Sequence, residues 1–536
     1  MGGLVAGEVW LVGAGPGDPG LLTVKGAWLL GRADVVVYDR LVDPALLSLA
    51  PQAELIEVGK GPHGSGARQQ DINDLLVARA RAGKKVLRLK GGDPFIFGRG
   101  GEEALALAEA GIPFRVVPGV TAASGCGAYA GIPLTHRHLS SSLCMATGHE
   151  EPGKDPQVDF RALARADGTV VVYMGVGRLE YVVQELLAGG RDGQEPAALV
   201  QKGTRANQRV VVAALGELVE RAREEKLSPP ALLIVGRSVS LRSRLDWYSR
   251  LPLAGCRIAL TRPRFWEGSG DGRAAPDDGD WGMEEARWEG AEVQVYHLLG
   301  ISPCLEGPAW KALVRELNAF TWILFTSVFG VFSFFSALWR EGRDSRTVAG
   351  CRVGAVGGGT AAALARWGVR PDLVANPHTV EALVGEVGRR LSPGDRLLLP
   401  RSDLAASQAD VLRAAGAAEV VEVAAYHTVF DGKEGDRLAR NVGAGEIDML
   451  VLTSASSARA AAAALGNTPP PGTAVSPGNT ASCRRAVLPV VAIGPATAAA
   501  AREAGLSVAE VAAEHDRAGL LQAVRRAWQS ARRRRE

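Results

Sequence analysis

The feature that most constrains the fold of this chain is a strand that ends in a glycine turn and leads into a helix. Residues 86–89 (Val-Leu-Arg-Leu) are predicted to form a buried strand, and the turn Gly91-Gly92-Asp93 follows, ahead of a helix from about Ala104. Because these glycines carry no Cβ, the turn exposes backbone N–H and C=O groups at a strand end, where open α/β sheets bind ligands. The turn is therefore a candidate small-molecule site. A purely geometric role of the glycines explains this segment equally well.

The same arrangement recurs along the first half of the chain. Predicted strands at 8–12, 33–39, 55–60 and 114–117 carry their conspicuous residues at the carboxyl end. From Thr135 onward the pattern indicates mixed strands with shorter connections. We expect residues 1–250 to form two α/β subdomains with a cleft between them.

The glycine turn Gly15–Gly20, nearer the N-terminus, also allows a different ligand. Gly15–Gly20 matches G-x-G-x-x-G, and Asp39 lies where a dinucleotide fold places its ribose-binding acid. Pro16 and Pro19, however, lack the amide N–H groups that a pyrophosphate needs. A nicotinamide site is thus the weaker alternative to another nucleoside site.

The size and the composition of the chain exclude several classes of protein. A length of 536 residues is more than one hydrophobic core serves, so two to four domains are expected. The net charge of +3 does not favour a nucleic-acid partner, and the six cysteines form no C-x-x-C pair that would indicate a metal site or a disulfide framework. The sequence shows neither a leader pattern nor an apolar run of membrane-spanning length, so the cytoplasm is the expected compartment.

The second half contains an internal repeat. Segments 322–327 and 449–454 are predicted strands that end in Thr-Ser, and segments 353–363 and 491–500 each read as strand, glycine turn, threonine and helix. The repeat predicts two similar α/β lobes. Hydroxyl groups collect at the predicted helix N-termini, which favour anions, so we expect a polyanionic ligand in a cleft; helix capping is the alternative role. The candidate substrate-binding residues are Thr326, Ser327, Thr360, Thr453, Ser454 and Thr497.

Six ordered motifs give the first half a resemblance to a known family. They are GAGPGDPGLLT (13–23), YDRLV (38–42), VGK (58–60), GGDPFIFGR (91–99), VPGVTA (117–122) and YMG (173–175). Together they resemble uroporphyrinogen-III C-methyltransferase, a tetrapyrrole methylase that uses S-adenosyl-L-methionine and releases S-adenosyl-L-homocysteine. The resemblance implies that Asp39 is the proton acceptor and Lys60 the proton donor. It also implies a cofactor site made of Pro16, Gly91, Gly92, Asp93, Ile96, Thr121, Ala122, Met174 and Gly203.

The second half resembles uroporphyrinogen-III synthase, through LTRP (260–263), FTS (325–327), LPRS (399–402), VAAYHT (423–428), LTS (452–454) and IGPATA (493–498). That family cyclises hydroxymethylbilane with loss of water, and Tyr426 is the residue expected to assist departure of the hydroxyl group. The expected domains are a methyltransferase domain at 1–245, a linker at 246–254 and a synthase domain at 255–536. Lobe one of the synthase would comprise about 255–303 plus 430–530, and lobe two about 304–429. Residues 267–280 are expected to be a disordered insertion in a surface loop.

The two resemblances together imply a bifunctional enzyme of tetrapyrrole biosynthesis. Its second half would make uroporphyrinogen III, and its first half would methylate that product twice to give precorrin-2, a precursor of sirohaem and cobalamin. The resemblance also suggests a homodimer formed through the first half. The alternative is an NAD-dependent dehydrogenase fused to a non-catalytic two-lobe anion-binding module.

Overall fold

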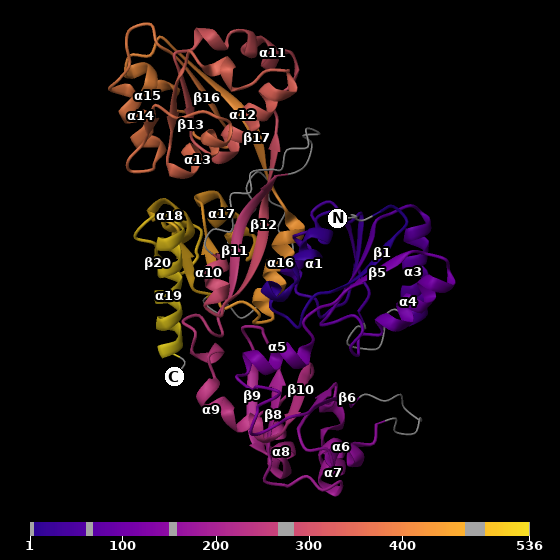
Figure 1. Cartoon of the computed structure of the whole chain (residues 1–536). Coiled ribbons are helices and arrows are strands. Elements are labelled where there is room, and N and C mark those ends of the chain that lie inside the picture. The colour runs from indigo at the N-terminus through magenta and orange to yellow at the C-terminus, as the bar shows by residue number, and fades with distance from the viewer. Residues whose placement is uncertain (1–4, 60–67, 149–157, 266–282, 467–487, 535–536) are drawn as a thin grey trace. The chain divides into compact units, whose positions relative to one another are not determined.

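The computed structural model describes residues 5–59, 68–148, 158–265, 283–466 and 488–534 (Figure 1). The chain divides into two compact units, Met1–Ile258 with Glu285–Gln294 and Ala259–Glu284 with Val295–Glu536. Lys60 and the expected insertion at 267–280 lie outside the described residues. Within the described residues, none of the helices is both long enough and apolar enough to cross a membrane.

The first unit opens with a parallel sheet. Its five strands in the described part of the chain have the order β3-β2-β4-β1-β5. They span Val9–Gly13 (β1), Val35–Tyr38 (β2), Glu54–Glu57 (β3), Val86–Lys90 (β4) and Phe114–Val117 (β5). Helices α1 (Val24–Leu30), α2 (Pro44–Leu47), α3 (Gln69–Arg81) and α4 (Gly100–Glu109) alternate with the strands, and α3 and α4 lie side by side (Figure 1). The buried strands β1, β2 and β4 form the centre of this sheet, as their sequences predict.

A mixed sheet forms the rest of the first unit. Its described strands have the order β6-β7-β10-β8-β9 and span Leu143–Thr147 (β6), Thr169–Tyr173 (β7), Pro196–Gln201 (β8), Arg209–Ala214 (β9) and Ala231–Val235 (β10). β6 and β7 are parallel, whereas β10 is antiparallel to both β7 and β8. The helices are α5 (Ala122–Tyr129), α6 (Phe160–Ala164), α7 (Leu179–Ala188) and α8 (Leu218–Glu224). The change to mixed strands predicted after Thr135 is confirmed.

Residues 237–250, which include part of the expected linker, form helical turns for which no element was predicted from the sequence. They are η4 (Arg237–Leu241), α9 (Arg242–Leu245) and η5 (Tyr248–Arg250). Each is too short to show a helical period in the sequence. Tertiary packing holds them, because the rings of Trp247 and Tyr248 lie against Tyr129 of α5 at centroid distances of 5.2 and 4.9 Å.

The second unit is built on a sheet in which ten described strands have the order β15-β14-β13-β16-β17-β12-β11-β18-β19-β20. Strands β11 (Arg257–Phe265) and β12 (Glu292–Pro303) run side by side (Figure 1), and β12 pairs antiparallel with β17 (Glu419–Phe430). The remaining strands are β13 (Trp322–Phe325), β14 (Arg352–Ala355), β15 (Leu373–Val374), β16 (Arg396–Ser402), β18 (Met449–Leu452), β19 (Val490–Ala492) and β20 (Val508–Val511).

The predicted internal repeat is visible in the pairing of these strands. β13, β14 and β15 are consecutive parallel neighbours, and so are β18, β19 and β20. Equivalent helices follow: α12 (Val328–Arg340) and α13 (Gly358–Arg366) in one copy, and α17 (Ala455–Ala464) and α18 (Pro495–Glu503) in the other. The α/β class and the two-lobed second half predicted from the sequence are therefore confirmed.

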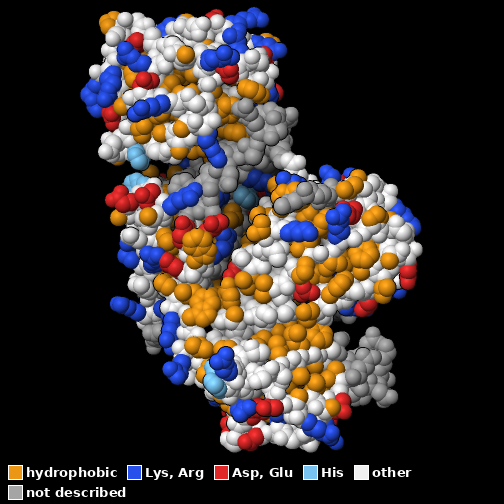
Figure 2. All heavy atoms as spheres, in the orientation of Figure 1, with side chains coloured by type: hydrophobic (Ala, Val, Ile, Leu, Met, Phe, Trp, Pro, Cys, Tyr) orange, Lys and Arg blue, Asp and Glu red, His pale blue; other side chains and the backbone are white. Residues whose placement is uncertain are grey.

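The other helices of the second unit are α10 (Met283–Trp288), α11 (Gly307–Arg315), α14 (Val380–Gly388), α15 (Ala409–Ala414), α16 (Gly432–Gly443) and α19 (Arg517–Arg533). Helix α12 contributes aromatic side chains to the core, because Phe334 and Phe335 are fully buried against Phe325 of β13. Basic and acidic side chains are interspersed over the visible face of the molecule (Figure 2), in keeping with the small net charge.

Candidate functional site

Three strand ends of the first sheet meet at Gly13, Gly92 and Gly119. Gly15 and Gly92 exchange two backbone hydrogen bonds, at N–O distances of 3.2 and 2.8 Å. A Cβ on Gly119 would lie 2.2 Å from the carbonyl oxygen of Gly92, and a Cβ on Gly13 would lie 2.5 Å from the Cα of Gly119. Only glycine permits this approach of three backbones, so the turns that follow β1, β4 and β5 are brought to one edge of the sheet.

The Asp93 carboxylate links the turn after β4 to the turn after β5 by hydrogen bonds. One of its oxygens accepts the N–H of Phe95 at 2.8 Å, and the other accepts the N–H of Gly119 at 3.0 Å. Gly92 is hydrogen-bonded to Gly15, but the side of Gly91 and Gly92 where a Cβ would lie is open, because a Cβ on either would meet no atom closer than 3.8 Å. This open backbone fits the close approach of a nucleoside, whereas Asp93 has a structural task that the sequence did not predict.

Tyr173, which the sequence did not single out as a site residue, joins the two subdomains at this edge. Its hydroxyl group lies 2.6 Å from Thr121 Oγ1 and accepts the N–H of Ala123 at 2.8 Å. The ring of Phe97 lies against it at a centroid distance of 4.7 Å. The next residue, Met174, is half exposed. Thr121, Ala122 and Met174, predicted from sites far apart in the sequence, are thereby brought close together.

Pro16 and Gly203 each make a close contact with helix α5. A Cβ on Gly125 would lie 2.4 Å from Cγ of Pro16, and a Cβ on Gly203 would lie 2.3 Å from Sγ of Cys126. Gly125 and Cys126 are neighbours in helix α5. The loop after β1 and the turn after β8 therefore both pack against that helix. Ile96, the remaining predicted cofactor residue, packs with Ala122 against the core of the second sheet.

Residues with a strained backbone conformation are concentrated in these turns. Of the six non-glycine residues with a left-handed backbone in the described chain, five belong to them: Phe97, Arg99, Met174, Lys202 and Thr204. Such a conformation costs about 1–3 kcal/mol per residue and persists where the surroundings enforce it, which is frequent at functional sites. The signal is conformational, so the sequence did not reveal it.

A buried network of charges ends at Asp39. Arg88 and Lys90 of β4 are each 2% exposed, and both donate to Oε1 of the fully buried Glu103, from Arg88 Nε at 3.1 Å and Lys90 Nζ at 2.7 Å. Arg88 also forms an ion pair with Asp39, which is about one third exposed at its side chain. Burial, helped by the nearby Arg88, lowers the pKa of Lys90. The sequence signal for this network is the pair of charged residues within a strand predicted to be buried.

The Asp39 carboxylate is thus the accessible end of an otherwise buried chain of ion pairs. Burying such charges contributes little net stability, and it fixes the orientation of the groups involved. The arrangement holds one carboxylate in place at the carboxyl edge of the sheet, where it can accept a proton. Lys60, the predicted proton donor, cannot be located relative to it, because it lies outside the described residues.

In the second unit the structure brings Ser327 and Tyr426 together. Their hydroxyl oxygens lie 3.0 Å apart, and Ser327 also caps α12 by accepting the N–H of Gly330 at 2.9 Å. Burial raises the pKa of Tyr426, so its hydroxyl group stays protonated. Beside it, Asp403 accepts hydrogen bonds from His427 at 2.9 Å and from the N–H of Thr428 at 3.2 Å.

The other predicted hydroxyl residues take part in helix starts. Ser454 caps α17 in a capping box with Ser457, and Thr453 donates to the carbonyl of Thr261 at 3.2 Å. Thr360 and Thr497 are buried in the first turns of α13 and α18, whose N-caps are Gly357 and Gly494. Ser327 and Ser454 therefore act as helix caps, which was the alternative to substrate binding.

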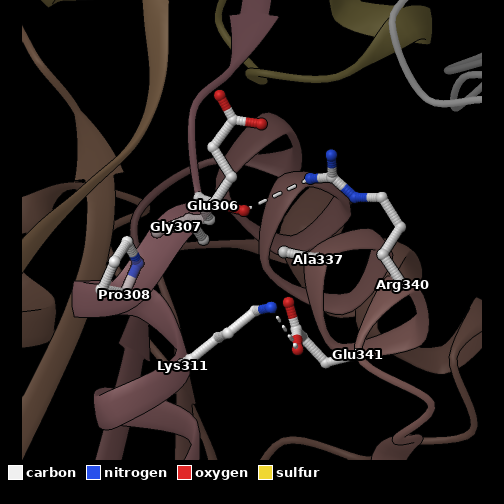
Figure 3. A pocket seen from close by; sticks show the side chains of 8 residues that line it. Glu306, Gly307, Pro308, Lys311, Ala337, Arg340 and Glu341 are labelled. Atoms are coloured by element: carbon white, nitrogen blue, oxygen red, sulfur yellow. Dashed lines mark hydrogen bonds and ion pairs between the residues drawn. The ribbon is translucent and has the colours of Figure 1, made fainter.

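A cavity of about 330 Å³ in the second unit is lined by none of these predicted residues. Its walls come from the start of α11 and the end of α12 (Figure 3). Arg340 donates to the carbonyl of Leu305 at 3.3 Å, and Lys311 lies 4.0 Å from the Glu341 carboxylate. Arg340, Lys311 and Glu341 thus have partners within the protein. No cluster of His, Cys, Asp and Glu in the described parts of the chain is suited to hold a metal ion.

Comparison with known proteins assigns each half of the chain to a protein family. Residues 8–219 match the model of the tetrapyrrole (corrin/porphyrin) methylases, and residues 283–522 match that of uroporphyrinogen-III synthase HemD. The porphyrin biosynthesis protein HemD of Ruminiclostridium josui is 38% identical over 451 residues, which cover 84% of this chain and 87% of that protein.

Two further relatives match the first half. The siroheme synthase of Stutzerimonas stutzeri is 53% identical over 250 residues, 46% of this chain and 54% of its own length, so the chain spans about half of that relative. A crystal structure of uroporphyrin-III C-methyl transferase from Thermus thermophilus, complexed with S-adenyl homocysteine, is 47% identical and covers 43% of this chain and 93% of its own, with a TM-score of 0.38. The chain belongs to the family of the R. josui porphyrin biosynthesis protein, and it is an enzyme that joins a tetrapyrrole methyltransferase to a uroporphyrinogen-III synthase.

Proposed function

We propose that this chain catalyses two consecutive steps of tetrapyrrole biosynthesis. The second half would cyclise hydroxymethylbilane to uroporphyrinogen III with loss of water, and the first half would transfer two methyl groups to that product to give precorrin-2. The observation that carries the proposal is the presence of both family matches on one chain, at 8–219 and 283–522. The domain limits, 1–245 and 255–536 with a linker between them, belong to the same proposal, as does a homodimer formed through the first half.

In the methyltransferase half, the residues of the chain would position the reactants. S-adenosylmethionine, when bound, supplies a methyl group on a sulfonium leaving group, so placement of the two reactants is the main task of the protein. The open backbone of Gly91 and Gly92 would take the nucleoside, and Thr121, Ala122 and Met174 would form the facing wall. Asp93, Ile96, Pro16 and Gly203 would complete the site.

Proton transfer would complete each methylation. The attacked ring carbon becomes tetrahedral, and a proton must leave the tetrapyrrole to restore a neutral ring system. Asp39 would accept it, because Arg88 holds its carboxylate at the accessible end of the buried charge network. Lys60 would be the corresponding proton donor.

In the synthase half, hydroxyl groups would hold and activate the linear substrate. Thr326, Ser327, Thr360, Thr453, Ser454 and Thr497 would bind the acetate and propionate arms through hydroxyl and helix N-terminal N–H groups. Tyr426 would donate a proton to the departing hydroxyl group, with Ser327 orienting its phenol at 3.0 Å.

A coupled assay on the full chain tests both steps. Hydroxymethylbilane and S-adenosylmethionine are supplied together, and the products are separated for the wild type, Asp39→Asn and Tyr426→Phe. We expect doubly methylated product from the wild type, and uroporphyrinogen III without methylation from Asp39→Asn. Tyr426→Phe should form less of the type III isomer while methylating supplied uroporphyrinogen III normally.

The proposal fails if the wild type yields only the spontaneously closed type I isomer and no methylated product. Calorimetric titration with S-adenosylhomocysteine and with NAD separates the methylase from the dehydrogenase alternative. Tight binding of NAD alone would exclude the methylase assignment.

A further inference from the structure

A closed ring of hydrogen bonds joins three segments of the first unit. The hydroxyl group of Tyr129 donates to Asp18 Oδ2 at 2.5 Å, and the backbone N–H of Asp18 donates to Thr204 Oγ1 at 3.0 Å. The N–H of Thr204 donates to Gln208 Oε1 at 2.8 Å, and Gln208 Nε2 returns to the carbonyl of Tyr129 at 3.1 Å. The ring therefore connects the loop after β1, the end of α5 and the turn after β8.

The ring borders two contacts on helix α5 that leave no space for a larger side chain, and the first of them joins the subdomains. Pro16, two residues before Asp18, packs against Gly125, and Gly203, next to Thr204, packs against Cys126. Thr204 is 2% exposed and has a left-handed backbone with φ of 69°. That conformation is unfavourable for a β-branched residue, so the bonds at its N–H and Oγ1 are what hold the turn in this shape.

The groups of the ring use their hydrogen bonds within the protein. Asp18 Oδ1 accepts the N–H of Gly20 at 2.7 Å, and its other oxygen accepts from Tyr129. Burial, together with the hydrogen bond to Asp18, raises the pKa of Tyr129 and keeps its hydroxyl group a donor. These residues therefore shape the site and are poorly placed to act on a substrate as acid or base.

We propose that Tyr129, Asp18, Thr204 and Gln208 are positioning residues, which hold Pro16 and Gly203 in place for the adenosyl methyl donor. This inference rests on the proposed function, because it takes S-adenosylmethionine as the ligand of the first half. The ring sets the affinity for the methyl donor and its product, and it leaves the methyl-transfer step unchanged once the donor is bound.

The test is calorimetric titration of the full chain with S-adenosylhomocysteine, combined with steady-state methylation of uroporphyrinogen III. Tyr129→Phe keeps the ring that packs against Trp247 and Tyr248 and removes only the hydroxyl group. We expect Kd for S-adenosylhomocysteine and KM for S-adenosylmethionine to rise roughly tenfold, since a hydrogen bond to a charged group is lost, with kcat unchanged within about twofold. Tyr248→Phe is the matched control, because its ring packs 4.9 Å from Tyr129 in the same cluster, and it should bind like the wild type.

A second pair of variants keeps the proposal testable should Tyr129→Phe fold poorly. Thr204→Val removes the acceptor for Asp18 and keeps the branched shape, whereas Thr204→Ser keeps the acceptor. We expect weaker binding of S-adenosylhomocysteine for valine and recovery for serine.

Wild-type affinity in both Tyr129→Phe and Thr204→Val would overturn the inference, and so would a lower kcat with unchanged KM. A wild-type chain that fails to bind S-adenosylhomocysteine would instead contradict the proposed function.

Discussion

Two neighbouring glycines at the start of α4 allow the packing of the Gly91–Asp93 turn to be tested directly. A Cβ on Gly100 would lie 2.3 Å from the carbonyl oxygen of Pro94, whereas a Cβ on Gly101 would meet nothing within 4 Å. The same oxygen accepts the N–H of Gly100 at 3.0 Å, so it is fixed from the side of the helix as well. Gly100→Ala therefore requires the Pro94 carbonyl to move, while Gly101→Ala requires no movement.

The size of the effect follows from these distances. Contacts of a Cβ below 3.0 Å are essentially never seen, so the Pro94 carbonyl must shift by at least about 0.7 Å. Overpacking of this kind costs about 1–3 kcal/mol. Pro94 follows Asp93 in the chain, and its displacement pulls on the hydrogen bond from Gly119 to Asp93. We expect Gly100→Ala to lower the stability of the first unit by about 2 kcal/mol and to raise Kd for S-adenosylhomocysteine at least about tenfold.

Gly101→Ala is the matched control. It exchanges glycine for alanine at the next position of the same helix, which is exposed whereas Gly100 is buried, and the gain in helix propensity there is roughly 0.5 kcal/mol. Calorimetric titration measures Kd, and scanning calorimetry with and without S-adenosylhomocysteine identifies the transition of the first unit through its ligand-dependent shift. The reasoning is refuted if the two alanine variants bind and unfold alike.

Three further predictions concern single side chains. Asp39→Asn should reduce methyl transfer by about 10²–10⁴-fold with Kd for S-adenosylhomocysteine unchanged; loss of binding would instead assign Asp39 to the cofactor. Ser327→Ala should destabilise the second unit by about 1 kcal/mol through the lost cap of α12, and should slow formation of the type III isomer by releasing Tyr426; an unchanged isomer ratio would limit Ser327 to capping. For Asp403, burial acts in the opposite direction, but hydrogen bonds led by that from His427 lower its pKa below the usual 3.8. A lowered carboxyl pKa stabilises the fold above the unfolded-state pKa and less as the pH falls through the folded-state value. Solvent screens the exposed Asp403 pair, so Asp403→Asn should cost only about 0.5 kcal/mol near pH 7, and less than that near about pH 3. Urea unfolding at both pH values measures this, and a pH-independent difference would contradict it.

The predicted order of elements agrees closely with the structure where the sequence carries a strong period. The buried strands that include Trp10, Val36 and Leu87 were predicted because short, mainly apolar runs that end in turn residues leave few alternatives. The repeat that relates β13 and β14 to β18 and β19 was likewise visible, since its Thr-Ser and glycine turns recur in order. The turns of residues 237–250 were not predicted, because such short elements are fixed by the aromatic cluster around Tyr129 and not by a local pattern.

For the site, too, the sequence identified individual residues, whereas the contacts between them were visible only in the structure. Gly91, Gly92, Thr121 and Met174 were named from motifs, and the fold gathers them at one edge of the first unit. The sequence did not show that Tyr173 links them or that Asp93 is engaged by the N–H of Gly119, since those contacts join residues 52 and 26 positions apart.

The sequence by itself determined the α/β class, the two unlike halves and the glycine turns at the carboxyl ends of the strands, because side-chain periodicity and backbone freedom are local properties. Only the tertiary structure decided what surrounds those turns. It placed Gly13, Gly92 and Gly119 in mutual backbone contact, ran a buried chain of charges from Glu103 through Arg88 to Asp39, and closed the ring of hydrogen bonds through Tyr129. Such arrangements depend on which distant segments meet, and that is settled by the packing of the whole unit.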